Sequence, residues 1–260
     1  MGSVLVCYSG GIDSALILAV AHEQLGSHAI GMTAVSPSLP ESELDGARQT
    51  ALQIGADHRM VMTNELARPG YVANGPDRCF HCKTELYELA EQKRVEWSLA
   101  FLLNGTNQDD LGDYRPGLEA ASNARVRSPL LELGLCKDDV RQLAMAVGLK
   151  IWAKPAAACL ASRIPYGTSV TPERLRQIEQ LEKALHALGF TQVRVRYHDV
   201  LARIEVPVTD LARLCSDPYR DALQRAGTEA GFTYVTLDVA GYRQGSHNLL
   251  LQGRSLKVVP

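Results

Sequence analysis

The sequence predicts an α/β fold in which a parallel sheet, covered on both faces by helices, is followed by a smaller C-terminal α+β domain. In the first 150 residues, short apolar runs alternate with helical patterns, which is typical of parallel strands joined by crossover helices. After residue 170 one long amphipathic helix precedes several short strands. The 260 residues can bury cores of this size without disulfides or metals.

The N-terminal elements follow from the spacing of apolar residues. Residues 3–8 are a continuous apolar run of the kind found in a buried strand, and Gly26 ends the helical pattern that follows. The same reasoning predicts strands at residues 3–8, 29–35, 58–62, 99–103 and 125–128. It predicts helices at residues 13–25, 41–54, 83–96 and 137–147.

A linker is expected at residues 151–170, because Pro155, Pro165 and Gly167 interrupt the pattern there. The second domain, residues 171–260, opens at Thr171-Pro172, a helix cap followed by proline at the first helical position. A long helix ending at Gly189 is followed by predicted strands at 191–197, 202–206 and 233–238 and a helical stretch over 210–230. The chain thus divides into residues 1–150, the linker and residues 171–260.

The composition is that of an ordinary globular enzyme. The net charge of −2 provides no general attraction for nucleic acid or anionic membranes, so we expect neither partner. No apolar run approaches the roughly 20 residues that span a bilayer, and the N-terminus lacks the basic region of a signal peptide. We therefore expect a cytoplasmic protein, in which the six cysteines are thiols or metal ligands.

The turn after the first strand, residues 9–14, has the features of a phosphate-binding site. Its glycines allow backbone N–H groups to approach a phosphate, and the helix that follows adds a positive dipole end. An acidic residue in such a turn suggests Mg²⁺ beside the phosphate. A tight strand–helix connection is the alternative reading. The candidate ligands are Ser9, Gly10, Gly11, Asp13 and Ser14.

A second loop, residues 104–117, is expected at the same edge of the sheet, where the carboxyl ends of parallel strands meet. Gly105 and Thr106 are candidate nucleotide contacts, and Arg48 is a further candidate from the second helix, although a solvated face suits it better. The acidic residues of the loop could instead cap a helix. With Asp13, the candidate Mg²⁺ ligands are Asp109, Asp110 and Asp113.

Three cysteines are candidates for chemistry: Cys79 and Cys82, in a C-x-x-C that enters a helix, and Cys159 in the linker. Three thiolates can hold three irons of a [4Fe–4S] cluster and leave the fourth open to another ligand. A zinc site that includes His81 and a redox dithiol are equally compatible with this pattern. Nearby cations, Arg163 among them, favour the thiolate of Cys159.

Arg194 and Arg196 lie two residues apart on a predicted strand, so their side chains share one face. A pair of guanidinium groups suits a phosphate, whereas a solvated strand face is the simpler alternative. We add Arg163 to them as a candidate substrate contact.

Four motifs together carry a family resemblance. The turn at 9–14 resembles the PP-loop of the ATP pyrophosphatases, which implies a Rossmann-like parallel sheet PP-loop ATP pyrophosphatase domain at residues 1–150. With the motifs at 105–117, 158–167 and 193–198, the chain resembles the LarE family of ATP-dependent sulfur transferases. That family adenylates the carboxylates of pyridinium-3,5-biscarboxylic acid mononucleotide and converts them to thiocarboxylates, in making the nickel-pincer nucleotide cofactor of lactate racemase.

The resemblance also implies cofactors and partners. ATP, Mg²⁺ and a small-molecule nucleotide substrate are expected, in a homo-oligomer such as a hexamer. In one form of the family, a cysteine matching Cys159 gives up its own sulfur. The presence of Cys79 and Cys82 implies the other form, in which a [4Fe–4S] cluster held by all three cysteines carries the sulfide. A tRNA-thiolating enzyme, another PP-loop enzyme such as an ammonia-using synthetase, and an ATP sensor without chemistry are the alternatives.

Overall fold

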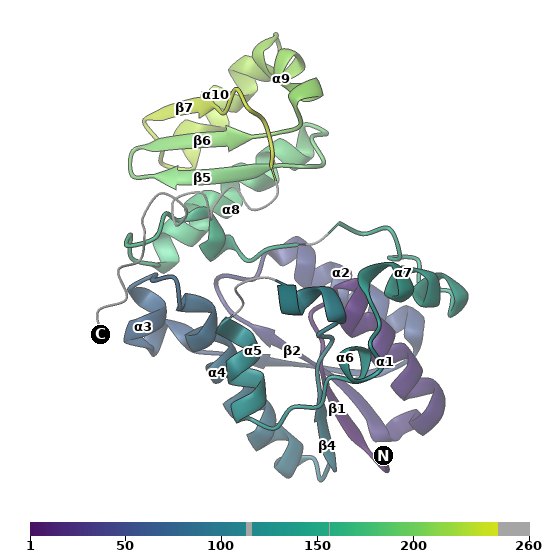
Figure 1. The fold of residues 1–260 in the computed structure, drawn as a ribbon. Coiled ribbons are helices and arrows are strands. Elements are labelled where there is room, and N and C mark those ends of the chain that lie inside the picture. The colour runs from purple at the N-terminus through teal and green to yellow at the C-terminus, as the bar shows by residue number, and fades with distance from the viewer. Residues whose placement is uncertain (113–115, 156, 244–260) are drawn as a thin grey trace. The chain divides into compact units, whose positions relative to one another are not determined.

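The computed structural model describes residues 1–112, 116–155 and 157–243, and the chain divides into two compact units, Met1–Ala158 and Cys159–Pro260 (Figure 1). In the N-terminal unit, the described strands form one parallel sheet in the order β3-β2-β1-β4. In the central strand, Leu5 lies between Ile30 and Leu102 of its neighbours. The strands are β1 (Val4–Cys7), β2 (Ala29–Val35), β3 (Asp57–Met62) and β4 (Phe101–Leu103).

Helices cover both faces of this sheet, because alternate residues of the buried strands point to opposite sides. Val4 and Val6 belong to one apolar cluster, with residues of α1, α2 and α7. Leu5 belongs to a second cluster, with residues of α4 and α5. The helices of this unit are α1 (Ile12–Leu25), α2 (Glu41–Ile54), α3 (Pro69–Val72), α4 (Arg78–Glu96), α5 (Pro116–Asn123), α6 (Pro129–Glu132) and α7 (Lys137–Ala146).

The C-terminal unit has a three-stranded sheet in the described residues, in the order β5-β6-β7, with β5 antiparallel and β7 parallel to β6. Its long helix begins as expected, with the Thr171 hydroxyl accepting the N–H of Arg174 at 3.3 Å. One face of that helix is fully buried. The elements are α8 (Pro172–Ala187), β5 (Arg194–His198), β6 (Leu201–Glu205), α9 (Val208–Cys215), α10 (Tyr219–Glu229) and β7 (Tyr234–Leu237).

The fold class is the one that the sequence predicts, but α3, α5 and α6 have no counterpart among the predicted elements, and other elements differ in their bounds. The strand predicted at 125–128 is a single bridge between Leu103 and Arg127, because Arg125 has a φ of +54° and α6 starts at Pro129. The helix predicted at 83–96 already begins at Arg78. The stretch predicted at 210–230 is two helices, separated before Pro218, which has no N–H to continue the first one.

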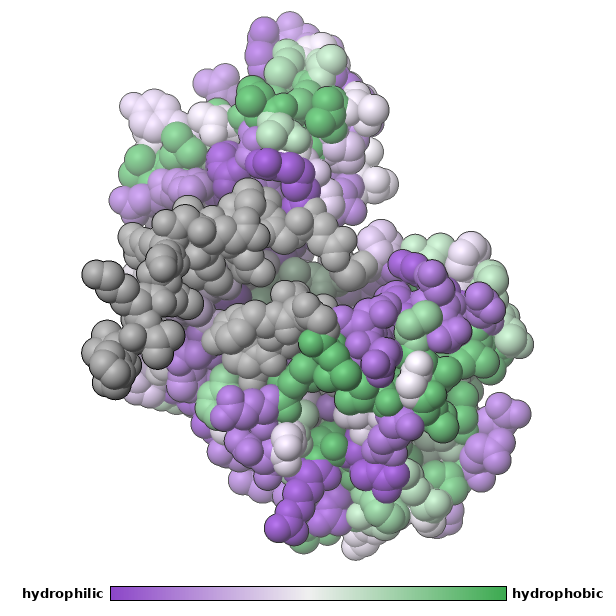
Figure 2. Space-filling view, in the orientation of Figure 1, coloured by the Kyte–Doolittle hydropathy of each residue, from purple (hydrophilic) through white to green (hydrophobic). Residues whose placement is uncertain are grey.

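The visible surface of the N-terminal unit carries both polar and apolar side chains, and apolar ones gather beside α6 (Figure 2). Leu133, which follows α6, is 73% exposed. No described helix combines the length and apolar character that crossing a membrane requires.

The buried face of α8 provides a test of the C-terminal core. Replacing Ile178, which is fully buried, with alanine leaves a cavity and should lower the free energy of unfolding by about 2–5 kcal/mol. Gln180 lies on the exposed face of the same helix, so Gln180→Ala should change it by less than about 0.5 kcal/mol. Urea unfolding followed by circular dichroism measures both. Equal losses for the two variants would contradict the assigned faces of α8.

Candidate active site

The turn between β1 and α1 brings backbone close to backbone at the carboxyl edge of the sheet. Gly10 has a φ of +74°, and a Cβ there would lie 2.7 Å from Cβ and 2.9 Å from Cα of Ala47 on α2. A residue other than glycine is therefore disfavoured at position 10, because it rarely adopts this positive φ and because its Cβ would clash with Ala47. The two glycines leave the N-terminus of α1 open to an anion, as a phosphate-binding turn requires.

Two hydroxyl groups order this turn. The Ser14 hydroxyl donates to the carbonyl oxygen of Gly11 at 3.1 Å and accepts the N–H of Ser9 at 3.1 Å. The Ser9 hydroxyl lies 3.1 Å from that of Ser14. The turn is thus preorganised before any ligand binds, which lowers the entropic cost of binding.

The second loop lies against the turn, as the sequence predicts. Leu103 at the end of β4 pairs with Val6 of β1, so both strands deliver their following loops to one edge. A Cβ on Gly105 would lie 2.7 Å from the backbone nitrogen of Ser14. The Thr106 N–H is held by the Asn104 side chain at 3.1 Å. The two loops therefore meet through their main chains.

Asp13 is already paired, with a residue that the sequence reasoning missed. Its carboxylate accepts a hydrogen bond from the Asn107 amide at 3.0 Å and one from the Lys137 ammonium at 2.5 Å. Lys137 starts α7, and its charge balances that of Asp13. Nothing in its sequence neighbourhood marks it, because the contact is made across 124 residues.

The acidic residues of the second loop cap backbone groups. Asp110 accepts the N–H of Asn107 at 3.1 Å, and Asp109 accepts the N–H of Lys137 at 2.9 Å. Asp113 lies outside the described residues. Within the part of the chain that the structure describes, no three His, Cys, Asp or Glu side chains gather as ligands for a metal. A Mg²⁺ site at Asp13 and Asp110 remains a proposal.

Lys154, whose contact with the turn the sequence did not indicate, is a second lysine beside it. The Lys154 ammonium donates to Glu43 of α2 at 2.6 Å and lies 3.4 Å from the Gly10 carbonyl oxygen. By contrast, Arg48 pairs with Asp45 at 2.9 Å and contacts the sulfur of Met60, on an exposed surface. These contacts match the expectation that Arg48 lies on a solvated helix face, and we leave it out of the proposed site.

Cys79 and Cys82 lie near the start of α4, three residues apart, so both thiols occupy one side of the helix. Cys79 is exposed, Cys82 is partly exposed, and neither forms a disulfide. His81 lies 3.2 Å from Asp77, four residues before it. Burial raises the pKa of the Cys7 thiol to about 12, which keeps that cysteine protonated and unsuited to be a ligand.

Cys159 is the first residue of the C-terminal unit, and its thiol is exposed. Its carbonyl oxygen anchors the short 3-10 helix Leu160–Arg163. That oxygen accepts the hydroxyl of Ser162 at 2.8 Å and a guanidinium N–H of Arg163 at 3.0 Å. The position is held through the main chain, and the sulfur atom remains available.

The three predicted arginines of this unit have different partners. Arg163 is buried and makes a two-pronged pair with Glu182, both contacts at 3.0 Å. Arg196 is buried against Glu205 at 2.8 Å and donates to the Ser162 carbonyl oxygen at 3.0 Å.

Arg194 is the least committed of the three. It is half-buried, donates to the Val193 carbonyl oxygen at 2.7 Å and stacks on the Tyr242 ring. In the described part of the chain, no carboxylate pairs with it. Burial and then the neighbouring charge of Arg163 lower the pKa of its guanidinium, so an anion beside it would stabilise its charge.

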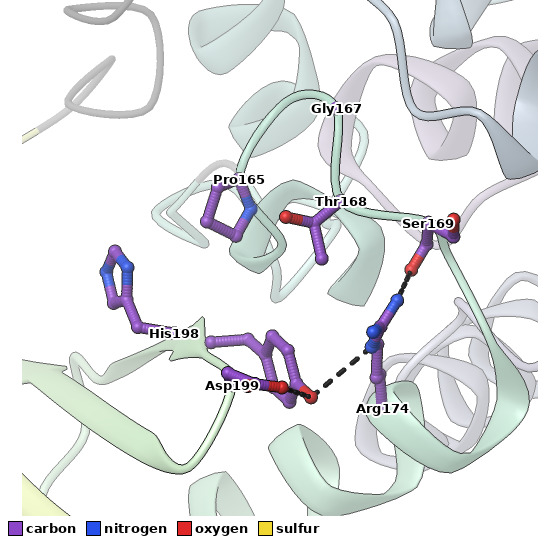
Figure 3. A pocket seen from close by; sticks show the side chains of 8 residues that line it. Pro165, Gly167, Thr168, Ser169, Arg174, His198 and Asp199 are labelled. Atoms are coloured by element: carbon purple, nitrogen blue, oxygen red, sulfur yellow. Dashed lines mark hydrogen bonds between the residues drawn. The ribbon is translucent and has the colours of Figure 1, made fainter.

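An open pocket of about 580 Å³ lies elsewhere in the C-terminal unit, between the loop at 165–169, the start of α8 and the end of β5 (Figure 3). Arg174 reaches across it to the Ser169 carbonyl oxygen at 2.6 Å and the Tyr197 hydroxyl at 3.3 Å. Its guanidinium is thus used within the fold. None of the predicted site residues that the structure describes lines this pocket.

Comparison with known proteins extends over almost the whole chain. Residues 2–72, which include the phosphate turn, match the asparagine synthase family. A pyridinium-3,5-bisthiocarboxylic acid mononucleotide synthase of Lactiplantibacillus plantarum is 37% identical over 94% of this chain and 88% of that protein. An uncharacterized protein of Synechocystis is 44% identical over 95% of this chain and 92% of its own length.

The contact between the two loops can be tested at Gly105. Gly105→Ala places a methyl group against the Ser14 backbone, so the turn must move. Overpacking of this kind costs about 1–3 kcal/mol of stability, and calorimetry should show weakened Mg·ATP binding. Gly2→Ala, where a Cβ meets nothing within 4 Å, is the control. Unchanged ATP affinity in Gly105→Ala would mean that the turn is not the phosphate site.

Proposed function

Because the chain belongs to the LarE family of ATP-using sulfurtransferases, we propose that it makes the product for which its Lactiplantibacillus relative is named. The proposed substrate is pyridinium-3,5-biscarboxylic acid mononucleotide, whose two carboxylates become thiocarboxylates in successive cycles. The observation that carries the proposal is the open glycine turn, packed against the Gly105 loop and flanked by two lysines.

The turn supports an adenylation step. A carboxylate oxygen of the substrate attacks the α-phosphorus of ATP, a P–O bond forms, and the bond to pyrophosphate breaks. Backbone N–H groups of residues 9–14 stabilise the charge that develops on the phosphates. Mg²⁺, bound beside Asp13 and Asp110, would supply further charge stabilisation. The acyl adenylate then carries AMP as a good leaving group.

The cysteines support the sulfur transfer. Attack of a sulfur nucleophile on the adenylated carbonyl carbon forms the C–S bond and releases AMP. Cys79 and Cys82 fit a [4Fe–4S] cluster in their chemistry, as thiols outside any disulfide on one side of a helix, and Cys159 is the third thiol of the set. A cluster held this way would supply an exchangeable sulfide. A symmetric homo-oligomer, for example a hexamer, could gather the same thiols from several copies.

The sacrificial form of the reaction is the second candidate, and the exposed thiol of Cys159 favours it. In that form, after the C–S bond to substrate has formed, a base removes the Cα proton of residue 159, the Cβ–S bond breaks, the thiocarboxylate leaves with the sulfur, and position 159 becomes dehydroalanine. The C-x-x-C motif then has no part in the chemistry. A tRNA-thiolating enzyme is disfavoured by the net charge of −2, since nucleic-acid binding depends on phosphate neutralisation.

Arg194 is the proposed ligand for the substrate phosphate. Arg163 and Arg196 are each bound to a buried carboxylate. We therefore assign them a structural role beside the site and not the binding of the substrate phosphate. This refines the expectation that Arg194 and Arg196 act as an equal pair.

The arginine assignment predicts a difference between two variants. Arg194→Ala should lose roughly 1.5–3 kcal/mol of binding to the nucleotide substrate and nothing with its dephosphorylated form. Arg196→Ala should instead lower the free energy of unfolding by roughly 1.5–3 kcal/mol, because the buried Glu205 loses one of its two arginine partners and keeps Arg203. Binding is measured by calorimetry and stability by urea unfolding. Equal loss of Arg194→Ala with both ligands would contradict the phosphate contact.

The sulfur source can be decided after anaerobic reconstitution with iron and sulfide. We expect an iron-containing protein in which Cys159 stays intact over several turnovers, as shown by mass spectrometry. Cys79→Ala should lose iron and multiple-turnover activity, whereas Cys215→Ala, an exposed cysteine outside the set, should keep both. Stoichiometric dehydroalanine at position 159, with no bound iron, would establish the sacrificial form.

A further inference from the structure

Lys154 links two parts of the proposed reaction that are distant in sequence. It lies in the segment that runs from α7 to the end of the N-terminal unit, four residues before that unit ends at Ala158. Its side chain turns back to the phosphate turn, 144 residues earlier in the chain. The same residue therefore contacts the nucleotide turn and belongs to the segment that leads to Cys159.

The contacts of the Lys154 ammonium are well defined. It lies 2.6 Å from a carboxylate oxygen of Glu43, which is in the first turn of α2, and 3.4 Å from the Gly10 carbonyl oxygen. Gly46, one turn further along α2, lies beside it, since a Cβ there would be 3.6 Å from the ammonium, an ordinary van der Waals distance. The ammonium thus sits between the turn and α2.

The pair with Glu43 can be exchanged for another anion. Both side chains are 23% exposed, so neither charge is fully removed from water. Glu43 also lies near the N-terminus of α2, where the helix dipole stabilises a carboxylate after its partner leaves. A phosphate at the glycine turn carries more negative charge than one carboxylate and would compete for the lysine.

We propose that Lys154 binds the phosphates of ATP in exchange for Glu43, and so anchors the segment that leads to Cys159 to the occupied nucleotide site. This rests on the proposed ATP-dependent function. Cys159 follows Lys154 by five positions, and an extended chain spans at most roughly 3.3–3.6 Å per residue. The Cα atom of Cys159 thus stays within roughly 18 Å of that of Lys154.

The test compares four variants in the full-length protein, with ATP binding measured by calorimetry. Lys154→Gln should weaken ATP binding about 10- to 100-fold, the size of a lost charged hydrogen bond, and Lys154→Arg should restore part of it. Glu43→Gln should bind ATP at least as tightly as the wild type, because a competing carboxylate is removed. Lys150→Gln, in the same segment and exposed, is the matched control and should behave as the wild type.

Hydrogen exchange of residues 150–158 measures the anchoring. Without ATP, both Lys154→Gln and Glu43→Gln should exchange faster than the wild type, since each breaks the same pair. ATP should restore protection in Glu43→Gln and leave Lys154→Gln unprotected. A lysine with a purely structural role would not give this dependence on ATP.

The outcomes separate this inference from the function on which it rests. If the wild type does not bind ATP, both are overturned. If the wild type binds ATP and Lys154→Gln binds it equally well, the role of Lys154 alone is overturned. Equal weakening in Glu43→Gln and Lys154→Gln would likewise overturn it, because the intact pair, and not the free ammonium, would then support the site.

Discussion

The site depends on main chains that meet without side chains between them. At the end of β1, Gly10 lies against the backbone of Ala47, and Gly105 lies against the backbone of Ser14. These two contacts fix α2 and the second loop relative to the N-terminus of α1. The proposed nucleotide site depends on these two contacts. The other residues around the turn belong to elements that can approach it only because glycine stands at positions 10 and 105.

Charge compensation is the second organising feature. Lys137 is paired with Asp13, Lys154 with Glu43, Arg163 with Glu182 and Arg196 with Glu205. The first two pairs are partly exposed, whereas the other two are buried. Exposed pairs contribute little to stability and exchange readily, but breaking a buried pair is costly. The lysines are thus suited to bind a ligand, whereas the two arginines stabilise the C-terminal unit.

The sequence was sufficient for the parts of the fold that are locally encoded. The strand at 29–35 and the helix at 41–54 have the predicted bounds, because their apolar spacing and the glycine after the helix are strong local signals. The packing of the Gly105 loop on the phosphate turn also followed from parallel topology. Lys137 and Lys154 could not be predicted, since each reaches the turn from more than a hundred residues away. The separate roles of Arg194 and Arg196 depend on Glu205, whose pairing is a property of the folded sheet.

Different atoms of Cys159 serve folding and chemistry. Its main chain anchors the 3-10 helix at Leu160–Arg163, whereas the proposed chemistry belongs to its side chain. Ser162 and Arg163 hold the carbonyl oxygen of Cys159, an atom that every amino acid supplies. Loss or replacement of the sulfur atom removes none of these hydrogen bonds. A spent protein would therefore keep the shape of an active one and escape quality control that recognises unfolded chains. Evolution, for the same reason, is free to change how this position obtains its sulfur without rebuilding the scaffold around it.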